Sequence, residues 1–539
     1  MRVNDNSLAA RVNGHAVATA GAGNGHEGGA GSAGNGHAVA AGGAGNGHEG
    51  GGRRRVSGAP RPAAIDAVGV RAAFFALSMA AAPGGSMIRR TARLLAACAL
   101  LATPVSAQIP ERGSYAFVNA NVIPMDGERV LNDHTVVVQN GRITAVGPAA
   151  STAVPAGATR IDARGKFLLP GLAEMHGHIP GGANVSTAED VLFLYVAAGA
   201  TTVRGMQGHP AQIELRRRVE SGELIGPRMW LAAPQLAGTI DAATASARVR
   251  DAKAAGFDLL KVHEDLSAET YAAIVRTARE VGLPWGGHVS QFVGVAGALA
   301  AGQSTIDHLD DYLDAMQPEN SPALAATGAD RVRLLPLHAD ESRMTALARA
   351  TRDAGVAVVP TQILWEVLRG ARDPATMIDR PENRYMARLT VQGWQNRVAN
   401  VYANADRAAA QREVVLRNRL LKTMNDEGVL ILMGTDAPQL FSVPGFSLYR
   451  ELPVMVQAGM TPYQVLRSGT VNVAKFFGIE AEAGTIAAGR RADLLLLDAN
   501  PLTDIRNVER NAGVMVDGRW LSPQLIRQRL DAMAAKHAG

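Results

Sequence analysis

Short apolar runs alternate with longer stretches rich in Ala, Arg and Glu from about residue 170 to about residue 480. The short runs predict buried strands, and the longer stretches predict the helices that follow them. The expected strands cover residues 167–175, 201–204, 229–232, 257–262, 285–288, 305–308, 356–360 and 430–434. This succession predicts an α/β fold, a (β/α)8 TIM barrel. An open doubly wound sheet is the structural alternative, but no Gly-x-Gly-x-x-Gly motif follows an early strand to support a dinucleotide site.

Strand-like patterns of a different kind flank this middle part. Asn140-Gly141, between two of the runs, is a strong hairpin signal. The runs cover residues 115–122, 135–139, 143–146, 492–498 and 514–519. We therefore expect a small β-sandwich domain built from both ends of the mature chain, residues 108–169 and 480–539, with the barrel at 170–479 inserted between them.

Residues 1–86 show no apolar period. Gly, Ala, Asn and His dominate residues 14–52, and one nine-residue unit occurs at both 21–29 and 43–51. Glycine at this density loses too much backbone entropy on folding. We therefore expect a disordered extension, or sequence translated upstream of the real start. A histidine-rich arm that collects metal is the alternative, because His15, His26, His37 and His48 are evenly spaced.

Residues 87–107 have the pattern of a secretory signal peptide. Arg89, Arg90 and Arg93 precede an apolar run, and Val105-Ser106-Ala107 supplies the small residues of a cleavage site before Gln108. The run is too short for a stable membrane span. Leu95 to Cys98 resembles a lipoprotein box, but too few apolar residues precede it. We expect Met87 to be the initiator and the mature protein to be periplasmic or secreted.

Charge is distributed unevenly along the chain. The net charge is +5, from 54 basic and 49 acidic residues, but residues 1–107 hold ten of the Arg and only four of the acids. The remaining 44 basic and 45 acidic residues give the part from 108 onward a net charge of −1. A body that binds nucleic acid is therefore not expected. A single cysteine excludes intramolecular disulfides and any cysteine-rich metal framework.

Polar residues with metal-binding chemistry stand at the ends of the expected strands. Residues two apart in a strand face the same side, so His176 and His178 can point into one cavity. A Lys in an apolar strand, such as Lys261, is costly unless it is used. A barrel gathers all strand ends on one face, where active sites lie. The sequence therefore predicts a metal centre formed by His176, His178, Lys261, His288, His308 and Asp436.

These residues resemble the amidohydrolase superfamily over nearly all of 114–520. The likeness lies in Leu168-Leu169-Pro170-Gly171-Leu172 leading into His-x-His, then Lys, His, His and Gly434-Thr435-Asp436 in the same order. Residues 483–494 resemble the family's β-sandwich segment. Residues 201–204 and 447–452 are similar to the imidazolonepropionase-like and prolidase-like branch. Glu174 stands where relatives usually have Asp and is not a ligand in the family pattern.

The resemblance implies a role for each residue. His176, His178 and Asp436 would hold a buried metal, His288 and His308 a second one, and Lys261 would bridge the two as a carbamate formed with CO2. Such a carbamate is an anionic ligand with two oxygens, whereas a free ammonium would repel cations. Histidine and oxygen ligands without thiolate favour Zn2+, with Mn2+, Co2+ or Fe2+ as alternatives. With Lys261 unmodified, we expect a single metal.

The expected reaction is hydrolysis of an amide-type C–N bond. Metal lowers the pKa of a bound water, and Asp436 takes the water proton and delivers it to the leaving nitrogen. We expect a small-molecule substrate, a dipeptide or an N-acyl amino acid. Cyclic-amide hydrolysis, deamination or lactone hydrolysis at the same site is the first alternative, and a non-enzymatic secreted binding protein that retains metal is the second. A homo-oligomer is possible, but no interface is specified.

Substrate contacts are less clearly indicated. His209 follows the second expected strand, His263 follows Lys261, and Gln362 follows the seventh strand, so each could line the substrate pocket. Surface loop positions explain the two histidines equally well. The acids next to His308, which are Asp307, Asp310 and Asp311, are explained equally well as helix-start or solvated charges.

Overall fold

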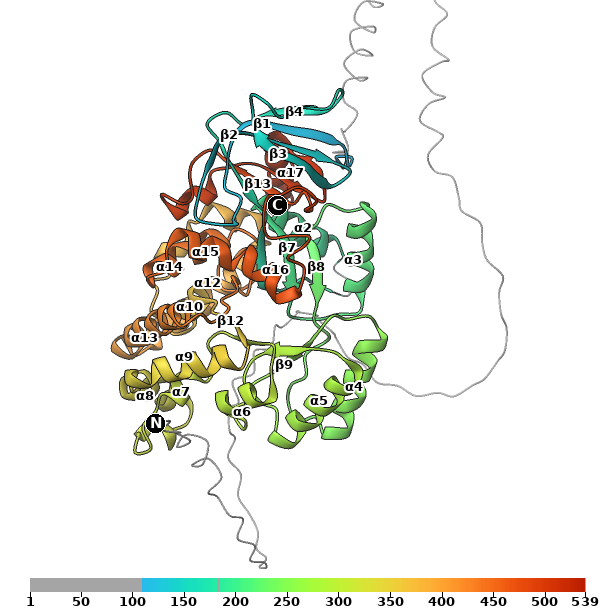
Figure 1. The fold of residues 1–539 in the computed structure, drawn as a ribbon. Helices are drawn as coiled ribbons and strands as arrows, with labels where there is room; N and C mark the ends of the chain where they lie inside the picture. The colour runs from blue at the N-terminus through green and yellow to red at the C-terminus, as the bar shows by residue number, and fades with distance from the viewer. Residues whose placement is uncertain (1–108, 182–184, 539) are drawn as a thin grey trace, which may run out of the picture. The chain divides into compact units, whose positions relative to one another are not determined.

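The structure, a computed structural model, describes residues 109–181 and 185–538 (Figure 1). The predictions for residues 1–86 and for the signal peptide at 87–107 therefore lie outside the described residues. Within the described ranges, no helix combines the length and the apolar character needed to cross a bilayer.

An eight-stranded sheet unites the two ends of the described chain (Figure 1). Its order is β15-β14-β13-β5-β1-β2-β3, with β4 beside β1. The strands are β1 (Ser114–Val122), β2 (Leu131–Gln139), β3 (Arg142–Pro148), β4 (Thr159–Asp162), β5 (Phe167–Pro170), β13 (Leu494–Leu497), β14 (Asn511–Val516) and β15 (Arg519–Leu521). Strand pairing does not separate them into the two facing sheets of a sandwich, so the predicted sandwich and its domain boundaries stay predictions.

Strand β13 separates two hydrophobic cores. Its four leucines are buried on both faces, as a continuous apolar run predicts. Leu494 and Leu496 pack with Phe117 inside the eight-stranded sheet's own core. Leu495 and Leu497 face the opposite way, into the large core of the parallel strands and helices. The alternation of side chains along a strand therefore attaches the sheet to the rest of the described chain.

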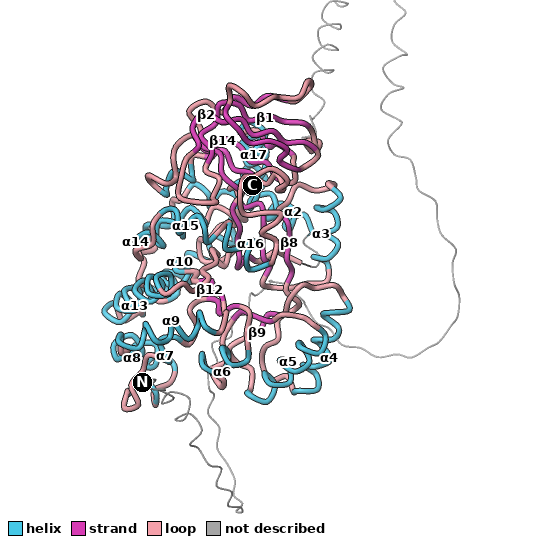
Figure 2. Tube along the Cα trace, in the orientation of Figure 1, coloured by secondary structure: helices cyan, strands magenta, loops and turns pink. Residues whose placement is uncertain are grey.

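Seven short parallel strands form the centre of the middle part (Figure 2). They fall into two sheets, β6-β7-β8 and β9-β10-β11-β12. The strands are β6 (Leu172–Gly177), β7 (Ala200–Gly205), β8 (Arg228–Leu231), β9 (Leu260–Val262), β10 (Trp285–Gly287), β11 (Thr305–Asp307) and β12 (Ala357–Val359). Single bridges, Ala232 to Leu259 and Leu236 to Val262, link the two sheets.

The first predicted strand, 167–175, is in fact two strands that belong to different sheets. The break lies at Gly171, whose N–H donates to the Asp493 carbonyl at 2.8 Å. A Cβ at this position would lie 2.2 Å from Oγ1 of Thr201, so only glycine fits the close approach of the chains. The prediction of one strand was wrong because an apolar run does not report such a crossing.

The last predicted strand, 430–434, does not form a regular strand. Its backbone groups bond to several neighbours: Leu432 N–H donates to Val358, Met175 N–H donates to Met433, and Met433 N–H donates to Ser468. No single ladder therefore forms, and the seven strands are not closed into a barrel by continuous pairing. Single parallel bridges, Val358 to Ile431 and Gly177 to Ala437, link this segment and its continuation to β12 and β6, so closure of the ring by an eighth strand stays a prediction.

Helices follow most of the parallel strands and lie outside them (Figure 2). Helix α5 illustrates their sequence signals: Ser267 caps its first turn by accepting from Thr270 N–H, and Gly282 ends it at φ 64°. The helices are α2 (Val185–Ala197), α3 (Ala211–Ser221), α4 (Ala242–Ala254), α5 (Ala268–Val281), α6 (Gly294–Ala301), α7 (Tyr312–Ala315), α8 (Gly328–His338), α9 (Met344–Asp353), α10 (Gln362–Leu368), α11 (Ala375–Ile378), α12 (Arg388–Asn404), α13 (Arg407–Asp426), α14 (Leu448–Gln457), α15 (Pro462–Ser468), α16 (Val471–Phe477) and α17 (Pro523–Ala538).

Candidate metal centre

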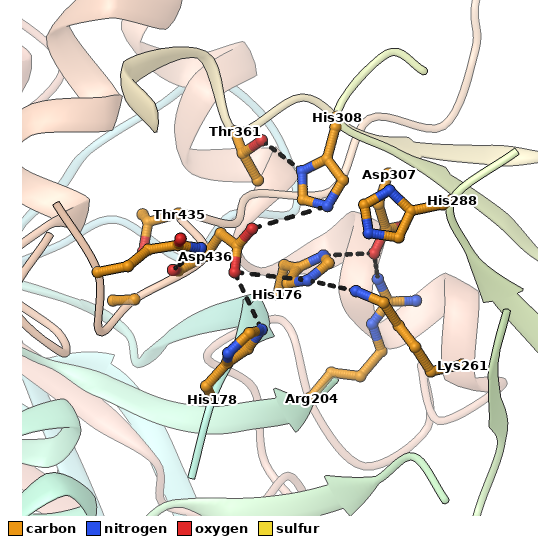
Figure 3. Close-up of polar contacts among 12 residues, drawn as sticks. His176, His178, Arg204, Lys261, His288, Asp307, His308, Thr361, Thr435 and Asp436 are labelled. Carbon is orange, nitrogen blue, oxygen red and sulfur yellow. Dashed lines mark hydrogen bonds and ion pairs between the residues drawn. The ribbon is translucent and has the colours of Figure 1, made fainter. Parts of the chain in front are cut away.

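The six residues predicted as ligands come from β6, β9, β10 and β11 or their ends and from the segment after 430–434, and they meet in one place (Figure 3). The Asp436 carboxylate is central to the group. Its Oδ1 lies 3.0 Å from His178 Nε2 and 3.7 Å from His176 Nε2, and its Oδ2 lies 3.7 Å from His308 Nε2. Lys261 Nζ lies 3.0 Å from His176 Nε2. The sixth residue, His288, has its ring 4.7 Å from that of His308, centre to centre.

The donor atoms in this group fit a cation. One ligand atom each from His176, His308 and Asp436 lie within 4.8 Å of one another. Nε2 of His178, Nε2 of His308 and Oδ1 of Asp436 are buried, and none of them makes a hydrogen bond within the described residues. Buried polar atoms without a partner are rare, and a shared ion satisfies all three at once. The set of imidazole and carboxylate groups suits a divalent metal.

Three of the imidazoles are oriented by a bond from the other ring nitrogen. His176 Nδ1 bonds Asp307 Oδ2 and His288 Nδ1 bonds Asp310 Oδ2, each at 2.6 Å, and His308 Nδ1 bonds Thr361 Oγ1 at 2.8 Å. Each bond leaves Nε2 as the nitrogen available for a metal. Partners of this kind fix the ring and raise its basicity as a ligand.

Behind His176 lies a fully buried ion pair that the sequence did not single out. Arg204 donates to Asp307 Oδ2 at 2.7 Å, to Thr305 Oγ1 at 2.9 Å and to the Met175 carbonyl at 2.5 Å. Arg204 and Asp307 are 0% exposed. The signals were present, since Arg204 lies in β7 and Asp307 ends β11 just before His308, but only the fold shows that they meet.

Glu174 lies beneath the centre and joins its two sides. Its carboxylate accepts from the backbone N–H of His176 at 2.9 Å and from Thr435 N–H at 2.8 Å, and Thr435 Oγ1 donates to it at 2.6 Å. A Cβ on Gly434 would lie 2.5 Å from Val359 Cγ1 and 2.8 Å from His176 N, so glycine allows this close approach of the chains. Glu174 therefore ties the backbone of His176 to that of Thr435, the residue before Asp436.

Left-handed backbone is concentrated at the centre. His308, Asp436 and Thr361 have φ values of 64°, 61° and 43°, and Asp311 has a φ of 60°. Side chains other than glycine rarely adopt this conformation, which costs free energy and persists where the surrounding contacts hold it. The strain falls on two predicted ligands and on the residue that orients one of them.

Burial and neighbouring charges keep the groups in states that suit a metal. Burial, with the nearby Lys261, lowers the pKa of His176 well below its ordinary value and that of His288 to about 3. Burial also lowers the pKa of Lys261. Burial opposes ionisation of Asp436, but His176 and His178 hold its pKa below the usual range. Neutral imidazoles and an ionised carboxylate are the forms that bind metal.

The three predicted substrate contacts have different surroundings. The His263 ring lies 4.5 Å from that of His288, centre to centre, so it borders the centre. Gln362 is buried, and its side chain bonds Asn418 at 2.9 Å and Arg417 at 3.1 Å, which occupies both ends of its amide. His209 is exposed, and its Nδ1 accepts from Ala211 N–H at 3.1 Å at the start of α3.

A cavity adjoins the centre on the side of His308. Loops after β9 and β11 and helices α10 and α13 form its walls. Its lining includes His308, Glu264, Asp310, Asp311, Trp365 and Arg417. Glu264, His288 and Asp310 also lie close enough together to share an ion, but Asp310 already bonds His288 Nδ1.

Comparison with protein families gives two adjoining matches. A model of the amidohydrolase family matches residues 167–521, and a model of the NagA composite domain matches residues 114–168. Together they cover the eight-stranded sheet, the parallel strands and all six residues of the candidate centre.

Two curated relatives are about a quarter identical to the chain over the aligned residues. An adenine deaminase from Chelativorans sp. (strain BNC1) is 26% identical over 398 residues, which cover 70% of this chain and 53% of that protein. An imidazolonepropionase from Sphingopyxis alaskensis is 26% identical over 395 residues, covering 71% of this chain and 91% of that protein. The chain thus spans about half the length of the adenine deaminase.

Solved structures share the fold. Bottromycin amidohydrolase matches with a TM-score of 0.62 at 24% identity, over 81% of this chain and 94% of that chain. A Xaa-Pro dipeptidase matches with a TM-score of 0.56 at 19% identity, over 76% of this chain and 100% of that chain. At these identities the likeness shows the arrangement of strands and helices, which is of the TIM-barrel type.

Proposed function

The chain belongs to the amidohydrolase family of hydrolases, and we propose that it hydrolyses an amide-type C–N bond in a dipeptide or an N-acyl amino acid at two divalent metal ions, Zn2+ by preference. The observation that carries the proposal is the convergence of His176, His178, Lys261, His288, His308 and Asp436, with three imidazoles turned so that Nε2 is available. In this proposal residues 430–434 serve as the eighth barrel strand.

His176, His178 and Asp436 would hold one ion and His288 and His308 the other, with Lys261 between them as a carbamate. Carbamate formation joins the uncharged amine of Lys261 to CO2 and releases one proton. The lowered pKa of Lys261 supports it, because burial makes the uncharged amine more accessible. The contact of Lys261 Nζ with His176 Nε2 supports its place between the ions.

Bound divalent ions supply Lewis acidity, which lowers the pKa of water and polarises a carbonyl. Asp436 is placed to take the proton of the attacking water, since its carboxylate is ionised and lies among three histidines. It then returns the proton to the leaving nitrogen. The water oxygen joins the acyl carbon, the C–N bond breaks, and the products are a carboxylic acid and an amine.

A second candidate is hydrolysis of a cyclic amide, or deamination, at the same centre. The curated relatives favour it, because they are an imidazolonepropionase and an adenine deaminase. The two candidates differ in product: deamination releases ammonia, and opening of a ring leaves a single product.

Export of the protein is part of the proposal. The signal pattern at 87–107 supports a mature chain that starts at Gln108. Expression of the gene in a bacterial host, followed by N-terminal sequencing of the protein in the periplasmic fraction, tests this. An N-terminus upstream of Met87, or retention of the chain in the cytoplasm, would contradict it.

Metal content per chain, measured on protein purified without chelator, tests the centre. We expect about two ions in the wild type, and a sharp loss of metal and of dipeptide hydrolysis in Lys261→Ala. Lys253→Ala is the matched control, because Lys253 is an exposed lysine of α4 whose side chain bonds the Gly282 carbonyl, away from the candidate centre. One ion that survives in Lys261→Ala would overturn the carbamate bridge and favour a mononuclear deaminase or cyclic-amide hydrolase.

A further inference from the structure

A chain of buried polar side chains leads from helix α5 to the backbone of His288. The indole Nε1 of Trp285 lies 3.4 Å from the Tyr271 hydroxyl, which lies 2.9 Å from Gln303 Oε1. Gln303 Nε2 then donates to the His288 carbonyl at 3.0 Å and to the Thr305 carbonyl at 2.9 Å. Trp285, Tyr271 and Gln303 are 6%, 4% and 1% exposed. Because water has little access to this chain, its polar atoms depend on their protein partners.

The donor and acceptor roles in this chain leave only one arrangement. An indole N–H can only donate, so the Tyr271 oxygen accepts from Trp285 and gives its own proton to Gln303. Burial raises the pKa of Tyr271, so the hydroxyl keeps that proton. The Gln303 oxygen therefore acts as an acceptor, and its NH2 group faces two carbonyls, which can only accept. The amide of Gln303 cannot turn over without losing three hydrogen bonds.

His288 needs such support, because it follows two glycines. Gly286 and Gly287 have no Cβ to restrict the backbone, and Gly287 has a φ of 114°. The N–H of His288 donates to the Val262 carbonyl of β9 at 3.2 Å. The carbonyl of His288 accepts from Gln303, which lies two residues before β11. Two hydrogen bonds thus hold this backbone between β9 and β11, the strands that carry or precede other predicted ligands.

Gln303 also joins the two strands that lead to the second pair of histidines. Ladder pairing of β10 with β11 ends at Gly287. Beyond it, one amide group bonds the carbonyls of His288 and Thr305, and so ties the end of β10 to β11. Strand β11 ends one residue before His308. The spacing of the two imidazoles, whose ring centres are 4.7 Å apart, is therefore set in part by the Gln303 amide.

We propose that Gln303 is a positioning residue that holds His288 at the distance from His308 that a shared ion requires. This rests on the proposed function, because the shared ion is the second of the two divalent ions proposed there. Gln303 is not a ligand and acts through the backbone of His288. Tyr271 and Trp285 assist it by fixing the direction of its amide. Loss of the amide should therefore weaken binding of the second ion more than binding of the first.

The test measures binding of Zn2+ at each of the two sites. Metal-loaded enzyme is equilibrated with a chelator that sets the free Zn2+ concentration, and the ions bound per chain are measured at each concentration. His288→Ala identifies the step that belongs to the second ion, since it removes one of its ligands. Gln303→Met keeps the length of the side chain without its amide. It should weaken the second ion about ten- to a hundredfold and leave the first within about twofold.

Tyr271→Phe is the second variant, and it removes only the hydroxyl that orients the amide. The two bonds from Gln303 to the carbonyls can still form, so the second ion should be weakened in the same direction but less than in Gln303→Met. This variant also decides the proposal if Gln303→Met does not fold. A weakened second ion in Tyr271→Phe would then support the positioning role, and binding equal to that of the wild type would overturn it.

Gln317→Met is the matched control. Gln317 is a buried glutamine, 4% exposed, whose Nε2 donates to the carbonyls of Leu313 and Leu335 and whose Oε1 accepts from Ser321. None of these partners is a predicted ligand. Its loss should lower the melting temperature, as the loss of Gln303 does, without changing the binding of either ion. Equal weakening of the second ion in both variants would mean that lost stability alone releases the metal, and would overturn the positioning role.

The outcomes separate this proposal from the proposed function. Two ions bound with equal affinities in the wild type and in Gln303→Met would overturn the positioning role and leave the hydrolase intact. Selective loss of the second ion in Gln303→Met, without hydrolysis of any dipeptide or N-acyl amino acid by the wild type, would support the positioning role and overturn the proposed substrates. A single ion in the wild type would overturn the two-ion centre and the positioning role together.

Discussion

The inner and outer sides of the candidate centre use the same bond in different surroundings. On the inner side His176 Nδ1 bonds Asp307, and on the outer side His288 Nδ1 bonds Asp310, each at 2.6 Å. The inner pair is 0% exposed, whereas the outer side chains are 11% and 9% exposed, and Asp310 borders the cavity.

The two carboxylates differ in whether an arginine is bonded to them. Burial would raise the pKa of Asp307, but Arg204 reverses this and lowers it. Asp310 has no guanidinium bonded to it, and burial raises its pKa to about 7. The inner acid is thus a permanently ionised anchor, while the outer acid depends on its surroundings. A preorganised inner side and a more adaptable outer side suit a centre that holds its metal and exchanges its substrate.

Removing Asp436 should disturb most of the centre, because its carboxylate lies within 3.7 Å of His176, His178 and His308. We expect Asp436→Asn to lower kcat by about 10²–10⁴-fold, the usual contribution of a general acid–base group. Steady-state kinetics on a dipeptide, together with circular dichroism to verify folding, measures this. Activity within a factor of ten of the wild type would remove Asp436 from the mechanism.

The two aspartates give the sharpest contrast. Asp307→Asn leaves the Arg204 charge buried without its partner and should lower the free energy of unfolding by about 3–5 kcal/mol. Asp310→Asn removes a carboxyl whose ionised form is disfavoured and should change it by about 1 kcal/mol or less. Urea unfolding of both variants measures the difference. Equal losses would mean that the inner and outer sides are not distinct.

Variants of Glu174 test which interaction holds the backbone of His176 and Thr435 in place. Glu174→Ala leaves the N–H groups of His176 and Thr435 without an acceptor and should cost about 2–3 kcal/mol. Glu174→Gln keeps one oxygen for both donors, since both bond Oε1, and should cost less. Unfolding curves and metal retention of the two variants give the comparison. A glutamine variant as unstable as the alanine variant would show that charge matters more than hydrogen bonding.

The last prediction concerns Glu451, which lies away from the ligands and accepts from Gln362 and Ile363 N–H at 2.8 and 2.9 Å. Burial raises its pKa from 4.5 to about 7. The folded state therefore holds the proton more tightly, and the free energy of unfolding falls as the pH rises from about 4.5 to about 7, then levels. Glu451→Gln should reduce this slope by up to about 1.4 kcal/mol per pH unit. An unchanged slope would contradict the assignment.

The barrel strands were predictable from sequence where a short apolar run by itself indicated a buried strand. Seven of the eight expected barrel strands correspond to β6 to β12, because a short apolar run buried on both faces has few alternatives. The run at 167–175 was misjudged as one strand, since it divides at Gly171, which bonds Asp493. The segment at 430–434 bonds β12 and β6 without forming a regular strand, because Met433 also bonds Ser468. Local pattern carries no information about such partners.

The sequence by itself determined which residue types end the strands, and the spacing of His176 and His178 on one strand already placed both imidazoles on one side. Only the tertiary structure decided which residues bond and orient the histidines. Arg204, Asp307, Asp310 and Thr361 come from separate strands and loops, and each became part of the centre by orienting an imidazole or an acid across the fold. A hydrogen bond requires its two atoms to lie about 3 Å apart. The order of residues along the chain does not show which residues far apart in sequence come that close.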